Sequence, residues 1–193
     1  MFKNVLFLFF VLAAGSVKAQ FTVNIQWQNS KPGYTGDTIH YDTDRKLTWN
    51  DFKGRPDAAS PAAAVTESGF GYRMSMNSYN NRTNVNIIVF CYFNKNKSWV
   101  KKGMKNNYGL LHEQHHFDIT YINACLFVKK LVKTKFNRSD YNAMLEQIYD
   151  EFYLALTKMQ NDYDGETANG RIEQMQMIWN KKIDQQLVTL STN

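Results

Sequence analysis

The sequence predicts a mixed α+β fold, with an antiparallel sheet of three or four strands in the N-terminal half and three helices after it. Three observations predict it. Apolar residues alternate with polar ones in several stretches between positions 21 and 94, as in strands. The stretch Leu110–Phe136 has helical spacing and contains neither proline nor glycine, and two further helical patterns follow it. Strands that precede helices favour segregated layers over alternating βαβ units.

Residues 1–19 have the plan of a secretory signal peptide. Lys3 precedes the apolar run Val5–Ala14, and Val17-Lys18-Ala19 ends the segment before Gln20. We therefore expect cleavage after Ala19 and a secreted or periplasmic mature protein. Residues 20–193 have the length of a single domain with a sizeable core.

The sequence also argues against two classes of partner. The apolar run near the N-terminus is too short to span a bilayer comfortably, and no second run of that kind follows, so we expect no membrane span. Lys3 and Lys18 are the only charged residues of the first 19, so cleavage lowers the formal net charge from +6 to +4. This small excess is not clustered among stacking aromatic residues, so we expect no nucleic-acid partner.

The strands are predicted from the period-two pattern. Phe21–Trp27 is the first, and Ala64–Met76 and Thr83–Asn94 are two more, joined by the short polar link Asn77–Arg82 as an antiparallel hairpin. Both faces of Thr83–Asn94 are apolar, so we expect this strand to be central and covered on both sides, with the helix over residues 110–136 as one cover.

Loops and a packed turn are expected between these strands. The polar stretch before Arg45 and the Ala- and Pro-rich stretch Asp57–Ala63 lack periodicity and are predicted to be loops. Leu47–Pro56 combines aromatic residues with turn formers, which predicts a packed turn. Asp51 is the residue of that turn with catalytic potential, but a structural role is the more common one.

Two helices are predicted after the long one. Asn137-Arg138-Ser139-Asp140 supplies a break and an N-cap, and the helix that follows runs from Tyr141 to about Asp162. Residues 161–170 are rich in turn formers and predict a connector. A last amphipathic helix starts near Ile172 and is expected to fray from about Leu190.

The candidate site lies at the start of the long helix, where His112-Glu113-Gln114-His115-His116 includes three of the four histidines of the chain. Residues four apart lie on one face of a helix, so His112 and His116 can bind one Zn²⁺ ion, and Glu113 can serve as general base. His115 lies about 100° away round the helix, which predicts an exposed position or one behind the ligands.

The two cysteines, Cys91 and Cys125, fall in a predicted strand and in the predicted metal-binding helix. An exported protein can pair them, but both have apolar neighbours, among which a free buried thiol is equally common. Both alternatives stay open, and two cysteines this far apart in the sequence do not form a zinc knuckle.

Three blocks together resemble a family of secreted bacterial proteins of unknown function that are predicted to be zinc-dependent proteases. They are Leu47-x-Trp49-x-Asp51-Phe52-x-Gly54-x-Pro56, His112–Ile119, and Tyr163-Asp164-x-x-Thr167-x-x-Gly170 followed by Gln176-x-x-Trp179. The resemblance implies a zincin-like metallohydrolase domain, with an N-terminal sheet, a metal-binding helix and two further helices. It also implies a secreted zinc-dependent peptidase acting on a peptide or protein, with His112 and His116 as ligands and Glu113 as base.

The third metal ligand is open, because this chain has Asn169 where the family usually has a histidine. A catalytic zinc ion takes three protein ligands, and an amide is a poor substitute for imidazole. The other candidates, in falling order of preference, are Asp164, then Glu166 and Glu146, and last His40. The alternative function is a non-catalytic secreted binding module of the same fold with a degenerate metal site.

Overall fold

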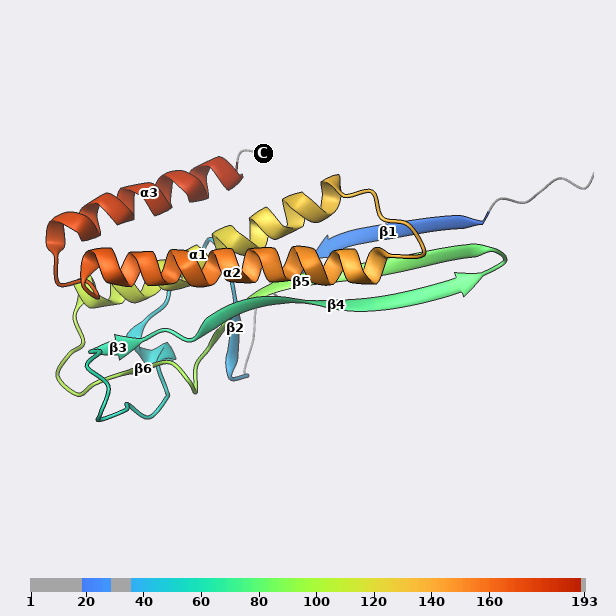
Figure 1. Cartoon of the computed structure of the whole chain (residues 1–193). Coiled ribbons are helices and arrows are strands. Elements are labelled where there is room, and N and C mark those ends of the chain that lie inside the picture. Colours follow the sequence, from blue (N-terminus) through green and yellow to red (C-terminus); the bar gives the residue numbers. More distant parts are fainter. Residues whose placement is uncertain (1–18, 29–35, 192–193) are drawn as a thin grey trace, which may run out of the picture.

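The computed structural model of this chain describes residues 19–28 and 36–191 (Figure 1). Strands and three α-helices follow one another in that part, so the mixed α+β prediction is confirmed. The strands are β1 (Gln20–Trp27), β2 (Thr38–His40), β3 (Ala64–Val65), β4 (Ser68–Tyr79), β5 (Arg82–Asn94) and β6 (Trp99–Val100), and the helices are α1 (Asn107–Lys133), α2 (Tyr141–Thr167) and α3 (Glu173–Ser191). The predicted signal peptide falls almost wholly on residues 1–18, which lie outside the described residues.

The larger sheet is built around β5. Strand β4 pairs antiparallel with nearly the whole of β5, while β1 pairs with residues 82–89 and β2 with residues 92–94. Strand β1 runs parallel to β5, so the prediction of an antiparallel sheet is wrong for this strand. Alternation of apolar residues sets which face is buried but not the strand direction, and the long connection between β1 and β5 permits either. The short strand β2 was expected to be loop.

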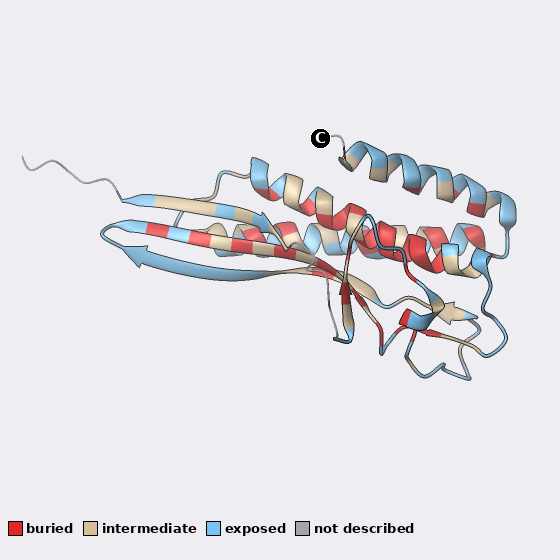
Figure 2. Cartoon of the chain, turned by 180° about the vertical axis from the view of Figure 1, so that it is seen from behind, coloured by how far each residue is buried: buried red, intermediate tan, exposed pale blue. Residues whose placement is uncertain are grey.

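The two faces of β5 differ in cover. Its inward side chains are buried (Figure 2), and they are Val85, Ile87, Val89, Cys91 and Phe93. Helix α1 contacts β4 and β5, so the expected helical cover is confirmed for this face. Ile88, Phe90 and Tyr92 on the other face keep part of their surface exposed, so the expected cover on both sides is wrong.

The predicted hairpin is confirmed, with a tighter turn than expected. Strand β4 continues to Tyr79 and β5 starts at Arg82, which leaves Asn80 and Asn81 as the turn. Their φ angles are 46° and 61°. A two-residue hairpin turn of type I′ requires positive φ at both positions, and asparagine tolerates it better than most residues.

The helices form layers over the sheet. Helix α1 packs on β4 and β5, while α2 and α3 pack on α1 (Figure 1). The apolar face of α1 is fully buried between them, and it includes Ile119, Ile122, Phe127 and Leu131. Burying each such side chain contributes roughly 1.5–3 kcal/mol, so α1 is the main core element. None of the helices in the described part of the chain combines the length and apolar character needed to cross a membrane.

Helix α2 is longer than predicted, because it continues to Thr167 through most of the expected connector. Gly165 inside a helix costs about 1 kcal/mol relative to alanine. Tyr163 and Thr167 are fully buried in the same turns, and their burial outweighs this cost. The helix ends where Ala168, Asn169 and Gly170 adopt positive φ. Asp164 therefore lies on a helix and not in a loop.

The stretch Leu47–Pro56 is the packed turn that was predicted. It holds the 3₁₀ helix η1 (Trp49–Asp51), and Leu47 and Phe52 are buried in the core. Asp51 accepts hydrogen bonds from Thr48 and forms a 2.8 Å ion pair with Arg45. Its role is structural.

The two cysteines do not form a disulfide in the fold. Cys91 is buried on β5, Cys125 is half-buried on α1, and both are free thiols. Burial raises the pKa of each thiol, which keeps both sulfurs protonated and inert as nucleophiles.

Candidate metal centre

Helix α1 brings His112 and His116 together. The helix begins at Asn107, after Asn106 caps it by accepting a 2.7 Å hydrogen bond from the backbone N–H of Gly109. His112 and His116 then lie one turn apart on one face, with their Nε2 atoms 3.2 Å from each other. Both imidazoles are buried. The predicted pairing of these two side chains is thus realised in the fold.

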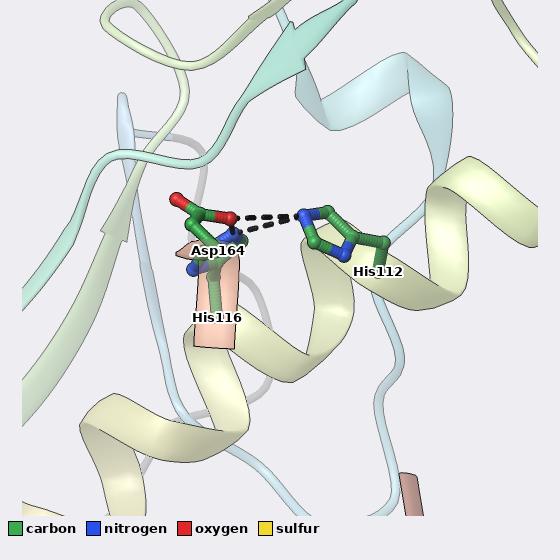
Figure 3. A group of neighbouring side chains, drawn as sticks. All are labelled: His112, His116 and Asp164. Atoms are coloured by element: carbon green, nitrogen blue, oxygen red, sulfur yellow. Dashed lines mark hydrogen bonds and ion pairs between the residues drawn. The ribbon is translucent and has the colours of Figure 1, made fainter. Parts of the chain in front are cut away.

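Asp164 joins this pair from the last turns of α2. Its Oδ1 atom lies 3.2 Å from His112 Nε2 and 3.1 Å from His116 Nε2 (Figure 3). Neither contact has the geometry of a hydrogen bond, so Oδ1 lacks a hydrogen-bond partner. A tetrahedral zinc ion with bonds of about 2.0–2.1 Å spaces its ligands about 3.3 Å apart. The three atoms therefore form a triangle of the size that one face of such a site requires.

The charges of the three groups support each other. Burial alone would lower the pKa of His116, but contact with Asp164, the charges of Glu113 and Asp164, and Gln160 together raise it to about 9. Burial alone would raise the pKa of Asp164, but His112 and His116 hold it well below its usual range. Asp164 is thus a carboxylate at neutral pH, as a metal ligand must be.

Glu113 lies beside this group. The residue is buried, and its Oε2 atom has no hydrogen-bond partner. Its neighbour in the fold is Thr66, whose hydroxyl donates to the backbone carbonyl of Glu113 and not to its carboxylate. A buried carboxylate oxygen without a donor is costly in a structural role, and such groups concentrate at functional sites.

All four side chains line one cavity of about 440 Å³. The rest of its lining comes from β3 and the chain on either side of it, from η1, from the start of α1 and from the turn after α2. The main contributors to these walls are Trp49, Ala62–Thr66, Tyr108 and Asn169–Arg171. The cavity thus combines a potential metal site, a carboxylate oxygen without a partner and walls of mixed polar and apolar residues, which suits a ligand site.

No protein-family model, curated protein or solved structure matches this chain. The function therefore has to follow from the chemistry of this site.

The remaining candidate ligands lie elsewhere. Glu166 accepts a 2.8 Å hydrogen bond from the indole Nε1 of Trp179. Glu146 is exposed on α2 and accepts from Asn142, while His40 lies on β2 with its Nε2 atom 2.9 Å from Gln28. None of the three belongs to the donor group of His112, His116 and Asp164.

The structure also shows where Asn169 and His115 lie relative to the metal ligands. Asn169 lines the cavity and lies in the turn after α2, where its φ is 54°. His115 is 2% exposed, so of its two expected positions, exposed or behind the ligands, the exposed one is excluded. Its Nδ1 atom lies 3.1 Å from Asp118 Oδ2, and Tyr41 donates to the same carboxylate. Helix α1 is buried on most sides, so a residue rotated off the metal face still points into protein.

Four residues that support the site were not predicted as functional. Gln160 and Gln176 contact the Nδ1 atoms of His116 and His112, and the ring of Tyr163 stacks on His112 at 4.7 Å. Gly170 packs against the same imidazole. Tyr163, Gly170 and Gln176 belong to the third block of the resemblance, which is the signal that marks them. No sequence signal marks Gln160.

The position of Gly170 gives a testable consequence. Its φ is 77°, and a Cβ there would lie 3.3 Å from His112 Nδ1. Gly170→Ala should lower the free energy of unfolding by about 1–2 kcal/mol, because alanine is strained in this conformation. It should also weaken zinc binding by displacing His112. Denaturant unfolding and a zinc titration measure both.

Gly165→Ala is the matched control for this substitution. Gly165 is helical, and nothing lies within 4 Å of the position that a Cβ atom would take there. Alanine at this position should stabilise the chain by up to about 1 kcal/mol. Equal stability and zinc affinity in the two variants would contradict the packing of Gly170 against His112.

Proposed function

We propose that this protein is a secreted zinc-dependent peptidase of the zincin type, with His112, His116 and Asp164 as ligands and Glu113 as general base. The observation that carries the proposal is the buried Glu113 carboxylate, whose Oε2 has no hydrogen-bond partner, in the same cavity as three convergent donor atoms. A purely structural metal site has no use for such a base. The three donors also leave a fourth coordination position, as catalytic zinc sites do.

The chemistry follows from these groups. A bound zinc ion would lower the pKa of a water molecule and polarise a carbonyl oxygen. Glu113 would accept the proton of that water and pass it to the leaving amine. Asp164 would balance part of the positive charge, and the buried imidazoles of His112 and His116 would keep bulk water from one side of the site.

The edge of strand β3 supports a peptide as the proposed substrate. Strand β3 pairs with β6 on one edge, and no other strand of the described chain pairs with β3. Ala62–Thr66, which includes β3, lines the cavity. An extended peptide can add to such an edge through backbone hydrogen bonds, and small alanine side chains leave room for it.

The test is metal-dependent hydrolysis by purified mature protein. We expect one zinc ion per chain and cleavage of members of a peptide library. A chelator should abolish the cleavage and added zinc should restore it, because the ion supplies the activated water. Tight zinc binding without hydrolysis of any peptide would instead support the non-catalytic binding module. A native chain that takes up no zinc would contradict the zinc-dependent peptidase.

A further inference from the structure

Each histidine of the donor group contacts a glutamine through the ring nitrogen that faces away from Asp164. His112 Nδ1 lies 2.8 Å from Gln176 Oε1, and His116 Nδ1 contacts Gln160 Oε1. An amide oxygen accepts hydrogen bonds and cannot donate them. Both Nδ1 atoms must therefore carry the proton in these contacts, which leaves the Nε2 lone pairs directed at the metal position.

The orientation of each amide is specified by what its nitrogen donates to. Gln160 Nε2 donates to the backbone oxygen of His116 at 2.8 Å and to Thr120 Oγ1 at 3.2 Å. An amide turned by 180° would place its oxygen against the carbonyl oxygen of His116, and both would be acceptors. The glutamine oxygen is thus held toward the imidazole.

Gln176 is held in the same way from the third helix. Its Nε2 donates at 2.6 Å to Tyr163 Oη and at 2.6 Å to Asn180 Oδ1. Gln176 is nearly inaccessible, with 1% of its surface exposed. With Asn180 in the orientation that the structure shows, a reversed Gln176 amide would place two oxygens against each other, whereas the observed orientation gives each N–H of Gln176 an acceptor.

We propose that Gln160 and Gln176 are positioning residues that hold both histidines with the proton on Nδ1, so that Nε2 can bind zinc. This inference rests on the metal site of the proposed function. The partners behind metal-bound histidines are often carboxylates, which make the ligands more basic. Neutral amides fix the ring without adding negative charge, so the ion would keep more of its Lewis acidity.

The proposal also gives α3 a role. Gln176 and Trp179 lie on the same face of α3, one turn apart. Trp179 is buried, and its indole N–H donates to Glu166 on α2. This anchor fixes α3 against α2 and thereby sets the position of Gln176. Trp179 thus docks α3 on α2, and Gln176, one turn before it, positions His112.

The experiment is NMR of the zinc-loaded full mature chain with ¹⁵N-labelled histidine, combined with zinc competition against a chromophoric chelator. The native protein should show slowly exchanging ring N–H protons on Nδ1 of His112 and His116. Gln176→Leu should remove that protection from His112 alone, and Gln160→Leu from His116 alone. Each should weaken zinc binding by about 10–100-fold, the usual effect of losing such a partner.

Two further variants separate positioning from general stability. Gln176→Glu keeps an acceptor for His112 Nδ1 and should keep its proton protected. Gln174→Leu alters an exposed glutamine of the same helix and should change neither spectrum nor affinity. If a leucine variant does not fold, the native spectrum and the glutamate variant still test the proton position.

The inference would be overturned by a protected proton on Nε2 of either histidine in the native protein. Leucine variants with both Nδ1 protons protected and native zinc affinity would overturn it as well. A chain that binds zinc with both Nδ1 protons protected but cleaves no peptide would overturn the peptidase function alone, and this inference would stand.

Discussion

Glu113→Gln should bind zinc as tightly as the native chain and lose peptide hydrolysis by about 10²–10⁴-fold, the usual contribution of a general base. The amide has nearly the shape of the carboxylate, so the cavity should keep its form. It cannot accept a proton from water, however, and the unpaired Oε2 is the atom placed to do so. Zinc competition and the rate of cleavage of a peptide found in the library screen measure the two effects.

Glu146→Gln is the control for this substitution. Glu146 is exposed on α2, where its carboxylate accepts from Asn142, and it lies outside the donor group. Its amide variant should keep native zinc affinity and native hydrolysis. If Glu113→Gln lost zinc together with activity, Glu113 would be a ligand and not a base. If it kept hydrolysis within tenfold of the native rate, the general-base role would be wrong.

Asp164→Asn should weaken zinc binding by more than about 100-fold, beyond the 10–100-fold that loss of a partner behind a ligand causes. The substitution preserves the shape of the side chain but replaces a charged oxygen donor with a poor neutral one. It also leaves two buried histidines without the carboxylate that lies between them. Competition titration at neutral pH measures the affinity, and circular dichroism checks that the helices persist.

Asp162→Asn and Asn169→Ala complete this test. Asp162 lies two residues before Asp164 on α2, where it forms a 2.6 Å ion pair with Lys158. Its amide variant should bind zinc normally. That result would show that loss of one negative charge on α2 is not enough to weaken zinc binding.

Asn169→Ala should also bind zinc at full stoichiometry. A chain that tolerated Asp164→Asn but lost zinc with Asn169→Ala would place the third ligand in the turn after α2.

The sequence alone was sufficient to predict the part of the site that lies within one helix. The spacing of His112 and His116 and the uninterrupted helical pattern around them depend on residues a few positions apart. The hairpin of β4 and β5 was predictable for the same reason, since alternation and a short polar link are local signals. A helix period is enough to place two side chains on one face, whatever the rest of the chain does.

Sequence reasoning reached the third donor only as one candidate among several. Asp164 is 48 positions from His116 in the chain, and the turn formers around it predicted a loop. The burial of Tyr163 and Thr167 carries α2 past Gly165 and thereby places Asp164 on a rigid helix facing α1. That outcome depends on packing between helices, which no local pattern encodes.

The same limit explains the other differences. The parallel direction of β1, the buried position of His115 and the two glutamines behind the histidines all depend on which elements become neighbours. Local spacing by itself determined the helix, the histidine pair and the adjacent carboxylate of Glu113. The tertiary structure decided which distant oxygen completes the donor group and which amides orient it, because those contacts join three helices that meet only in the folded chain.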